Sequence, residues 1–157
     1  MELPKSILEK LVNRTIEYIQ NDLGMGDIDQ NFEIAEVDQL VLMDISTMIA
    51  LSGCVKGTVC LSVSNEMAFK MVESFIYGEM EKSELEELAS ENVAETLNIV
   101  LGNILAEIDA VKEGASVDIS TPYTLHNSVT ITKKKNGKMF LCTLHYKGEE
   151  IILGYFI

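Results

Sequence analysis

The sequence predicts an α+β fold, a two-layer sandwich in which two long helices pack on one face of a mostly antiparallel sheet. Two segments repeat apolar residues at helical spacing, and the segments between them are rich in β-branched residues and bounded by turn signals. A tetrapeptide also occurs twice, as Asp44–Thr47 and Asp118–Thr121. Each copy follows a helical segment and precedes a cysteine-containing strand, so we expect a pseudo-twofold internal duplication.

The composition is that of one globular domain spanning residues 1–157, with 47% hydrophobic and 24% charged residues. The sequence has no long uncharged apolar run, and MELPKSILEK lacks the apolar region of a signal peptide, so we expect a cytoplasmic protein. The net charge of −13 argues against nucleic acid and anionic membranes as partners, because both require a basic surface.

The first half of the chain predicts a helix, a strand pair and a second helix. Residues 4–23 have helical periodicity, and GMGD at 24–27 ends this helix because glycine tolerates the left-handed turn. Residues 40–52 and 55–64 are expected to form an antiparallel pair. A helix capped by Ser64 or Asn65 then closes at Gly78.

The second half predicts a long helix followed by several strands. The helix spans about residues 83–110 and ends near Gly114. Residues 115–157 carry three or four strands, separated at His126-Asn127, Asn136-Gly137 and Lys147-Gly148. The basic run around Asn136-Gly137 is expected to be a solvated hairpin tip, and the chain ends in the hydrophobic strand IILGYFI.

The sequence carries no clear motif for metal binding or for nucleophilic catalysis. Cys54, Cys60 and Cys142 form no CxxC motif and have no nearby histidine pair, so we expect buried free thiols. His126 and His145 are most simply strand residues, and no phosphate-binding glycine motif occurs.

The long helix carries a narrow polar stripe beside its apolar face. At 100° per residue, with Glu95 at 0°, Asn98 lies at about 300° and Gly102 at about 340°. An apolar arc from about 140° to 280° faces the core; it contains Val93, Leu97, Val100, Leu101, Ile104, Leu105 and Ile108. Such an edge is most often a solvated face.

Three features of the stripe disfavour the helix locally. Asn98 competes with backbone hydrogen bonds, Gly102 costs about 1 kcal/mol relative to alanine, and Glu91 repels Glu95 four residues later. The stripe is therefore a candidate site, in which Gly102 and Ala106 leave a groove for another protein's backbone. The alternative is that Gly102 admits a neighbouring helix of the same chain.

The segment Glu95-Thr96-Leu97-Asn98, followed by Gly102-Asn103 and by Pro122 in the next strand, resembles the helix motif of the CheC, CheX and FliY chemotaxis phosphatases. The upstream segment LSGCVKGTVCLSVSNEMAFKMVESFIYGE is similar to the strand, strand, helix passage of that family. Together these similarities cover residues 42–125.

The resemblance implies that the chain dephosphorylates the phosphoaspartate of a CheY-type response regulator. Asn98 would orient the attacking water, and Glu95 would engage the regulator's active-site lysine. Glu91, Gly102 and Asn103 would contact the partner, although Glu91 stands where the family more often has a short aspartate or serine. No cofactor is expected on this chain, and Mg²⁺ would belong to the partner receiver domain.

The resemblance also implies a single site and a homodimer. CheC-like members carry the motif on two equivalent helices, whereas Glu9 and Asn13 on the first helix here are one residue too far apart. A CheX-like protein with one site is therefore expected. CheX-like members pair through sheet edges, so we expect a homodimer built with the C-terminal strands, because the apolar IILGYFI would suit burial.

Two other readings of the stripe stay open at this stage. In the first, the chain is a non-catalytic binding module that docks on a receiver domain or a flagellar switch component without turnover. In the second, the chain is a structural dimer, and its stripe is covered by packing. The sequence does not name the cognate regulator.

Overall fold

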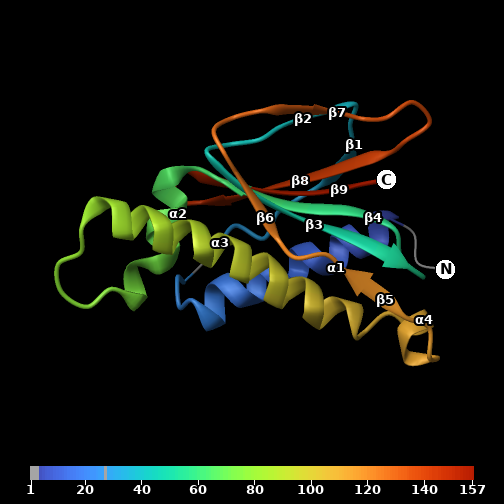
Figure 1. The fold of residues 1–157 in the computed structure, drawn as a ribbon, viewed down its shortest axis with the longest axis horizontal. Coiled ribbons are helices and arrows are strands. Elements are labelled where there is room, and N and C mark those ends of the chain that lie inside the picture. Colours follow the sequence, from blue (N-terminus) through green and yellow to red (C-terminus); the bar gives the residue numbers. More distant parts are fainter. Residues whose placement is uncertain (1–3, 27) are drawn as a thin grey trace.

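Helices cover one face of an antiparallel sheet, and a two-stranded ribbon covers the other (Figure 1). The computed structural model describes residues 4–26 and 28–157. Its helices are α1 (Pro4–Glu17), which continues as the π-helical turn η1 (Tyr18–Asp22), α2 (Asn65–Val72) with the 3₁₀ turn η2 (Glu73–Phe75), α3 (Lys82–Leu105) and α4 (Asp109–Lys112). Its strands are β1 (Ile34–Glu36), β2 (Gln39–Val41), β3 (Ile45–Gly53), β4 (Gly57–Val63), β5 (Val117–Ile119), β6 (Tyr123–His126), β7 (Thr130–Thr132), β8 (Met139–Tyr146) and β9 (Glu149–Phe156).

The main sheet has the strand order β1-β8-β9-β4-β3, and both β5 and β6 pair with the outer edge of β3. Every pairing is antiparallel. The β8–β9 hairpin closes through the predicted turn at Lys147-Gly148, where both residues have positive φ (45° and 85°). The predicted α+β fold with two long helices on one sheet face is confirmed.

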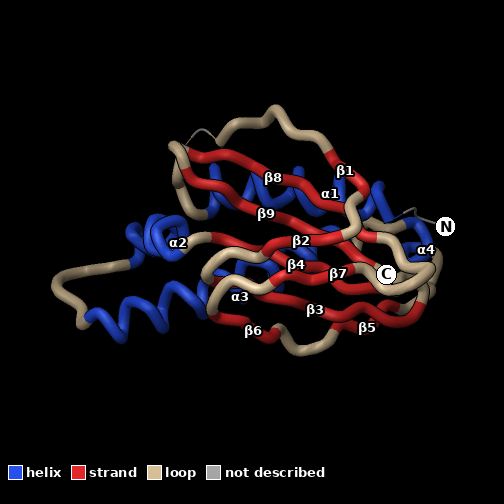
Figure 2. Tube along the Cα trace, turned by 90° about the horizontal axis from the view of Figure 1, so that it is seen from above, coloured by secondary structure: helices blue, strands red, loops and turns tan. Residues whose placement is uncertain are grey.

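Two hydrophobic clusters lie on opposite faces of the sheet, because side chains alternate along each strand. On β9, Ile151 and Leu153 pack under the helices, whereas Ile152 packs under the ribbon. The ribbon is the antiparallel pair β2–β7, which lies above the sheet in Figure 1 and in front of it in Figure 2. Its Leu40 packs so closely that a Cβ on Gly154 would lie 3.1 Å from the Leu40 Cδ2 atom.

Several predicted boundaries were wrong in detail. The stretch predicted as one strand from residue 40 is divided, because β2 leaves the sheet to form the ribbon and β3 begins at Ile45. The second helix ends at Val72 and continues only as the short turn η2 instead of reaching Gly78, since most residues beyond it, such as Phe75 and Tyr77, are exposed and only Ile76 packs against the core. The long helix ends at Leu105, and α4 follows after a tight turn. Asp27 of the predicted GMGD stop lies outside the described residues.

The C-terminal strand does not offer an edge for dimerisation, which corrects that part of the prediction. β9 pairs with β8 on one side and with β4 on the other, and β8 is itself flanked by β1. Residues 151–155 of IILGYFI are therefore buried within the chain's own sheet, and only its end at Ile157 is exposed. The homodimer itself stays a prediction, and β1, β5 and β6 are the strands left at the edges of the described sheet.

The fold has a pseudo-twofold arrangement, but the repeated tetrapeptide does not mark it. β4 and β9 are central neighbours, β3 and β8 flank them, and β2 pairs with β7, so α1–β4 and α3–β9 form related halves. By contrast, Asp44–Thr47 lies at the start of β3, whereas Asp118–Thr121 spans the end of β5 and the link to β6. The tetrapeptide copies therefore occupy non-equivalent positions.

The three cysteines are free, as predicted, although their burial differs from the prediction. Cys60 on β4 and Cys142 on β8 are buried on opposite faces of the sheet, but Cys54 is exposed. Cys54 follows Gly53 in the turn between β3 and β4. Over the described part of the chain, no helix is apolar and long enough to cross a membrane.

Candidate functional site

The predicted apolar arc of α3 faces inward, which leaves the polar stripe on the outside. The helix packs against α1, α2 and β3, and all residues of the arc are buried. Amphipathic periodicity thus fixes the rotation of α3 about its own axis. Figure 1 shows α3 running along the helical face of the sheet, beside α1.

Glu95, Asn98 and Gly102 form an accessible surface on this helix. Glu95 is exposed, and Asn98 is partly buried at the boundary of the packed face. A Cβ added to Gly102 would have no atom within 4 Å outside its own helix. The structure therefore contradicts the alternative in which Gly102 admits a helix of the same chain, and no part of the described chain covers the stripe there.

An acidic cleft of about 510 Å³ adjoins the N-terminal half of this stripe. Glu91, one of the predicted partner-binding residues, lines the cleft and is exposed. Asp44, Glu86 and Glu87 add carboxylates, and His126 from β6 lines the opposite wall. This charge favours a cationic group of a partner beside Glu91.

The turn η1, which continues α1, lies on the side of α3 opposite the acidic cleft, near Glu95. Burial raises the pKa of the Tyr18 hydroxyl, and the negative charges of Asp22 and Glu95 add to this rise. The hydroxyl of Thr96 and the guanidinium of Arg14 act in the opposite direction. Tyr18 and Glu95 are therefore close enough to interact electrostatically across the two helices.

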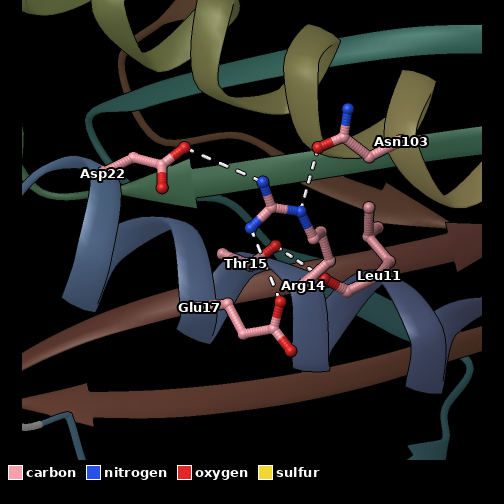
Figure 3. Close-up of polar contacts among 6 residues, drawn as sticks. All are labelled: Leu11, Arg14, Thr15, Glu17, Asp22 and Asn103. Carbon is pink, nitrogen blue, oxygen red and sulfur yellow. Dashed lines mark hydrogen bonds and ion pairs between the residues drawn. The ribbon is translucent and has the colours of Figure 1, made fainter.

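Asn103, a further predicted partner-binding residue, has a contact within the chain. Arg14 Nε donates a hydrogen bond of 2.9 Å to Asn103 Oδ1 (Figure 3). Asn103 lies at about 80° on the helix, on the α1 side and far from Asn98. Sequence reasoning missed Arg14, although a signal existed: it is the only arginine in the sequence.

The first helix shows what stands at the positions equivalent to Glu95 and Asn98. Thr15 and Thr96 are both buried, and each hydroxyl donates 2.7 Å to the carbonyl four residues earlier. Aligning α1 and α3 on these threonines places Arg14 opposite Glu95 and Glu17 opposite Asn98. Because Arg14 Nη1 and Glu17 Oε2 form an ion pair at 3.6 Å, α1 presents no matching carboxylate and amide. This observation agrees with a single site.

The side chains of the stripe can position groups of another molecule by hydrogen bonding. A carboxamide both donates and accepts hydrogen bonds, and a carboxylate accepts them from a cationic donor. Within the described residues, no group of three or more His, Cys, Asp or Glu side chains is arranged to hold a metal ion. The accessible amide and carboxylate, one helical turn apart, therefore suit an interaction with a reacting group carried by another molecule.

Known proteins resemble this chain in sequence and in fold. The family model described as "Chemotaxis phosphatase CheX" matches residues 45–145. The "CheY-P phosphatase CheX" of Thermotoga maritima is 33% identical over 117 residues, which cover 74% of this chain and 72% of that protein.

Solved structures share the fold at low sequence identity. CheX from Desulfovibrio desulfuricans has a TM-score of 0.72 at 14% identity, with 95% of this chain and 97% of the other covered. The CheX–CheY–BeF₃–Mg²⁺ complex from Borrelia burgdorferi gives a TM-score of 0.68 at 17% identity, with 94% of both chains covered. On the evidence of the family model and the Thermotoga relative, this chain belongs to the CheX family of chemotaxis phosphatases.

Proposed function

We propose that this chain hydrolyses the aspartyl phosphate of a CheY-type receiver domain, with Asn98 positioning the attacking water and Glu95 docking the receiver's lysine. The observation that carries the proposal is the accessibility of Glu95 and Asn98, one turn apart, beside the open position at Gly102. Family membership and the Thermotoga phosphatase, named for its action on CheY-P, support the reaction.

Asn98 acts by orientation in this proposal. Phosphoryl transfer depends mainly on in-line placement of the nucleophile and on stabilisation of charge, with little covalent help from the enzyme. The Asn98 amide accepts a hydrogen bond from the water and donates another to an acceptor beside it. Asn98 is partly buried at the edge of the packed face of α3, and this restricts the rotamers of its side chain. Less side-chain entropy is therefore lost when the receiver docks.

Glu95 supplies the docking contact. Its exposed carboxylate pairs with a lysine ammonium on the receiver, and Glu91 extends the negative surface toward the acidic cleft. Gly102 leaves room for the receiver's backbone on the same stripe. The Mg²⁺ ion that the reaction requires belongs to the receiver's own phosphorylation site in this proposal.

The test is the decay of a phosphorylated receiver with wild type, Asn98→Ala and Glu95→Ala. Asn98→Ala should lower kcat by at least about a hundredfold with a small change in KM, because it removes the group that orients the water. Glu95→Ala should mainly raise KM, because it removes a charged docking contact. Asn13→Ala and Glu9→Ala are matched controls, since both residues are exposed on α1 and should leave the rates unchanged.

Unchanged decay with Asn98→Ala would refute the assigned role. If wild type bound the receiver stoichiometrically, without turnover and regardless of phosphorylation, the chain would instead be a binding module for a receiver or flagellar switch component.

A further inference from the structure

Arg14 forms the centre of a polar cluster that joins α1, η1 and α3 (Figure 3). Its Nε donates to Asn103 Oδ1 at 2.9 Å, its Nη1 pairs with Glu17 Oε2 at 3.6 Å, and its Nη2 pairs with Asp22 Oδ2 at 3.7 Å. Three nitrogens of one guanidinium thus face three different acceptors. The Arg14 side chain is 24% exposed, whereas Glu17 and Asp22 are 64% and 48% exposed.

The π-helical turn η1 explains how Asp22 reaches Arg14. In a regular α-helix, residues eight positions apart differ by about 80° around the axis. The wider turn of η1, closed by the hydrogen bond from Leu23 N to Tyr18 O at 2.9 Å, brings Asp22 back toward the side that carries Arg14. The local backbone of α1 is therefore shaped around this cluster.

The contact with α3 falls next to Gly102, a glycine within that helix. Asn103 follows Gly102, and glycine in a helix interior leaves the backbone freer to open or bend than other residues do. No side chain at Gly102 packs against the rest of the chain, and this open position is one turn beyond Asn98. A tie to α1 at residue 103 holds the helix at this point.

We infer that Arg14 is a positioning residue, which anchors Asn103 to α1 and thereby keeps α3 straight and helical through Gly102, so that Asn98 stays in register with Glu95. The inference rests on the proposed function, because Asn98 must be fixed relative to the docked phosphate. It assigns Asn103 to the anchor and not to partner contact. Only arginine has the planar fork of donors that reaches three acceptors at once, so lysine is not an equivalent residue here.

The first experiment is amide hydrogen exchange of residues 99–105 in wild type, Arg14→Met, Asn103→Ala and Asn103→Asp. Arg14→Met keeps the length of the aliphatic stem but removes every donor. Exchange in this segment should accelerate about fivefold or more in Arg14→Met and in Asn103→Ala. Asn103→Asp should restore protection, because a carboxylate is a strong acceptor for a guanidinium.

The second experiment separates kcat from KM for receiver dephosphorylation in the same variants. Arg14→Met and Asn103→Ala should each lower kcat about tenfold, with KM within about twofold of wild type. The double variant should be no slower than either single variant, since both remove the same contact. Asn103→Asp should recover most of the lost kcat. Lys133→Ala is the control, because it removes a surface ion pair with Asp38 at 3.1 Å on the ribbon, across the sheet from the helices.

Three results would overturn the inference. These are wild-type exchange and kcat in Arg14→Met, a raised KM in Asn103→Ala but not in Arg14→Met, and losses that multiply in the double variant. Asn98→Ala, assayed in parallel, distinguishes this failure from failure of the proposed function. If Asn98→Ala is slow while Arg14→Met has the wild-type rate, the positioning role alone is wrong.

Discussion

Replacing Gly102 with alanine should stabilise the fold and weaken action on the receiver. The residue lies within α3, has ordinary helical backbone geometry, and a Cβ there would have no atom within 4 Å outside its own helix. The alanine can therefore be accommodated without strain, and its helix propensity should raise the free energy of unfolding by about 1 kcal/mol. For a chain of this size, the corresponding rise in Tm is about 2–4 °C.

The effect on function has the opposite sign because the new methyl group lies on the stripe with Glu95 and Asn98. If the receiver's backbone approaches at Gly102, a methyl there must be accommodated at the interface at a cost of about 1 kcal/mol or more, equivalent to about a fivefold rise in KM. Gly102→Leu should raise KM further while still folding, since Gly102 is exposed and an added Cβ has no neighbour within 4 Å outside its own helix. In both variants, kcat should change less than KM.

The assay pairs thermal unfolding with the initial rate of receiver dephosphorylation over a range of receiver concentrations. The graded pair of alanine and leucine separates steric exclusion at the interface from an effect on the helix, because both residues favour the helix over glycine. Two results would refute the reasoning: a lower Tm for Gly102→Ala, which would mean that the position is not open, or an unchanged KM for both variants.

Three further predictions concern the sheet and its thiols. A Cβ on Gly154 would lie 2.8 Å from Cys60 Sγ, so Gly154→Ala should lower the free energy of unfolding in urea by about 1–3 kcal/mol, and adding Cys60→Ala should recover part of the loss. Because Cys54 is exposed while Cys60 and Cys142 are buried, a thiol reagent should label Cys54 in the native protein and all three cysteines in denaturant. Burial raises the pKa of Cys60 to about 12 and that of Cys142 to about 11, above the value of about 8.5 in an unfolded chain. The stability that these two protonated thiols contribute is therefore complete below about pH 8.5 and declines as the pH rises toward 11–12. Urea titrations at pH 8 and 10.5 should show a smaller loss of unfolding free energy for Cys142→Ala than for wild type, and an equal loss would contradict this prediction.

Periodicity and turn chemistry predicted the elements that are specified locally. The apolar arc of α3 is buried as predicted because a helix must turn its hydrophobic side to the core. The Lys147-Gly148 dipeptide alone predicts the hairpin turn, since glycine there accepts the positive φ that a two-residue hairpin requires. The same angular argument placed Glu95 and Gly102 on the exposed side.

Features that depend on distant pairing could not be predicted in this way. The ribbon joins Gln39–Val41 to Thr130–Thr132, and three-residue strands carry too little pattern to identify partners across most of the chain. IILGYFI is equally hydrophobic whether it lies in the centre of a sheet or at a dimer interface, so its sequence could not place it between β4 and β8. The contact of Arg14 with Asn103 likewise depends on how α1 and α3 pack.

The arrangement of α3 makes loss of function separable from loss of fold. Its buried face packs against α1, α2 and the sheet, whereas Glu91 and Glu95 are exposed and Asn98 is only partly buried. None of these three side chains belongs to either hydrophobic cluster. Substitutions at exposed positions outside such features usually change stability by less than about 0.5 kcal/mol. Removing Glu91 or Glu95 also relieves a like-charge repulsion within the helix. The proposed docking stripe can therefore hold residues that disfavour the helix, because the opposite face and the proposed anchor at Arg14 hold the helix in place.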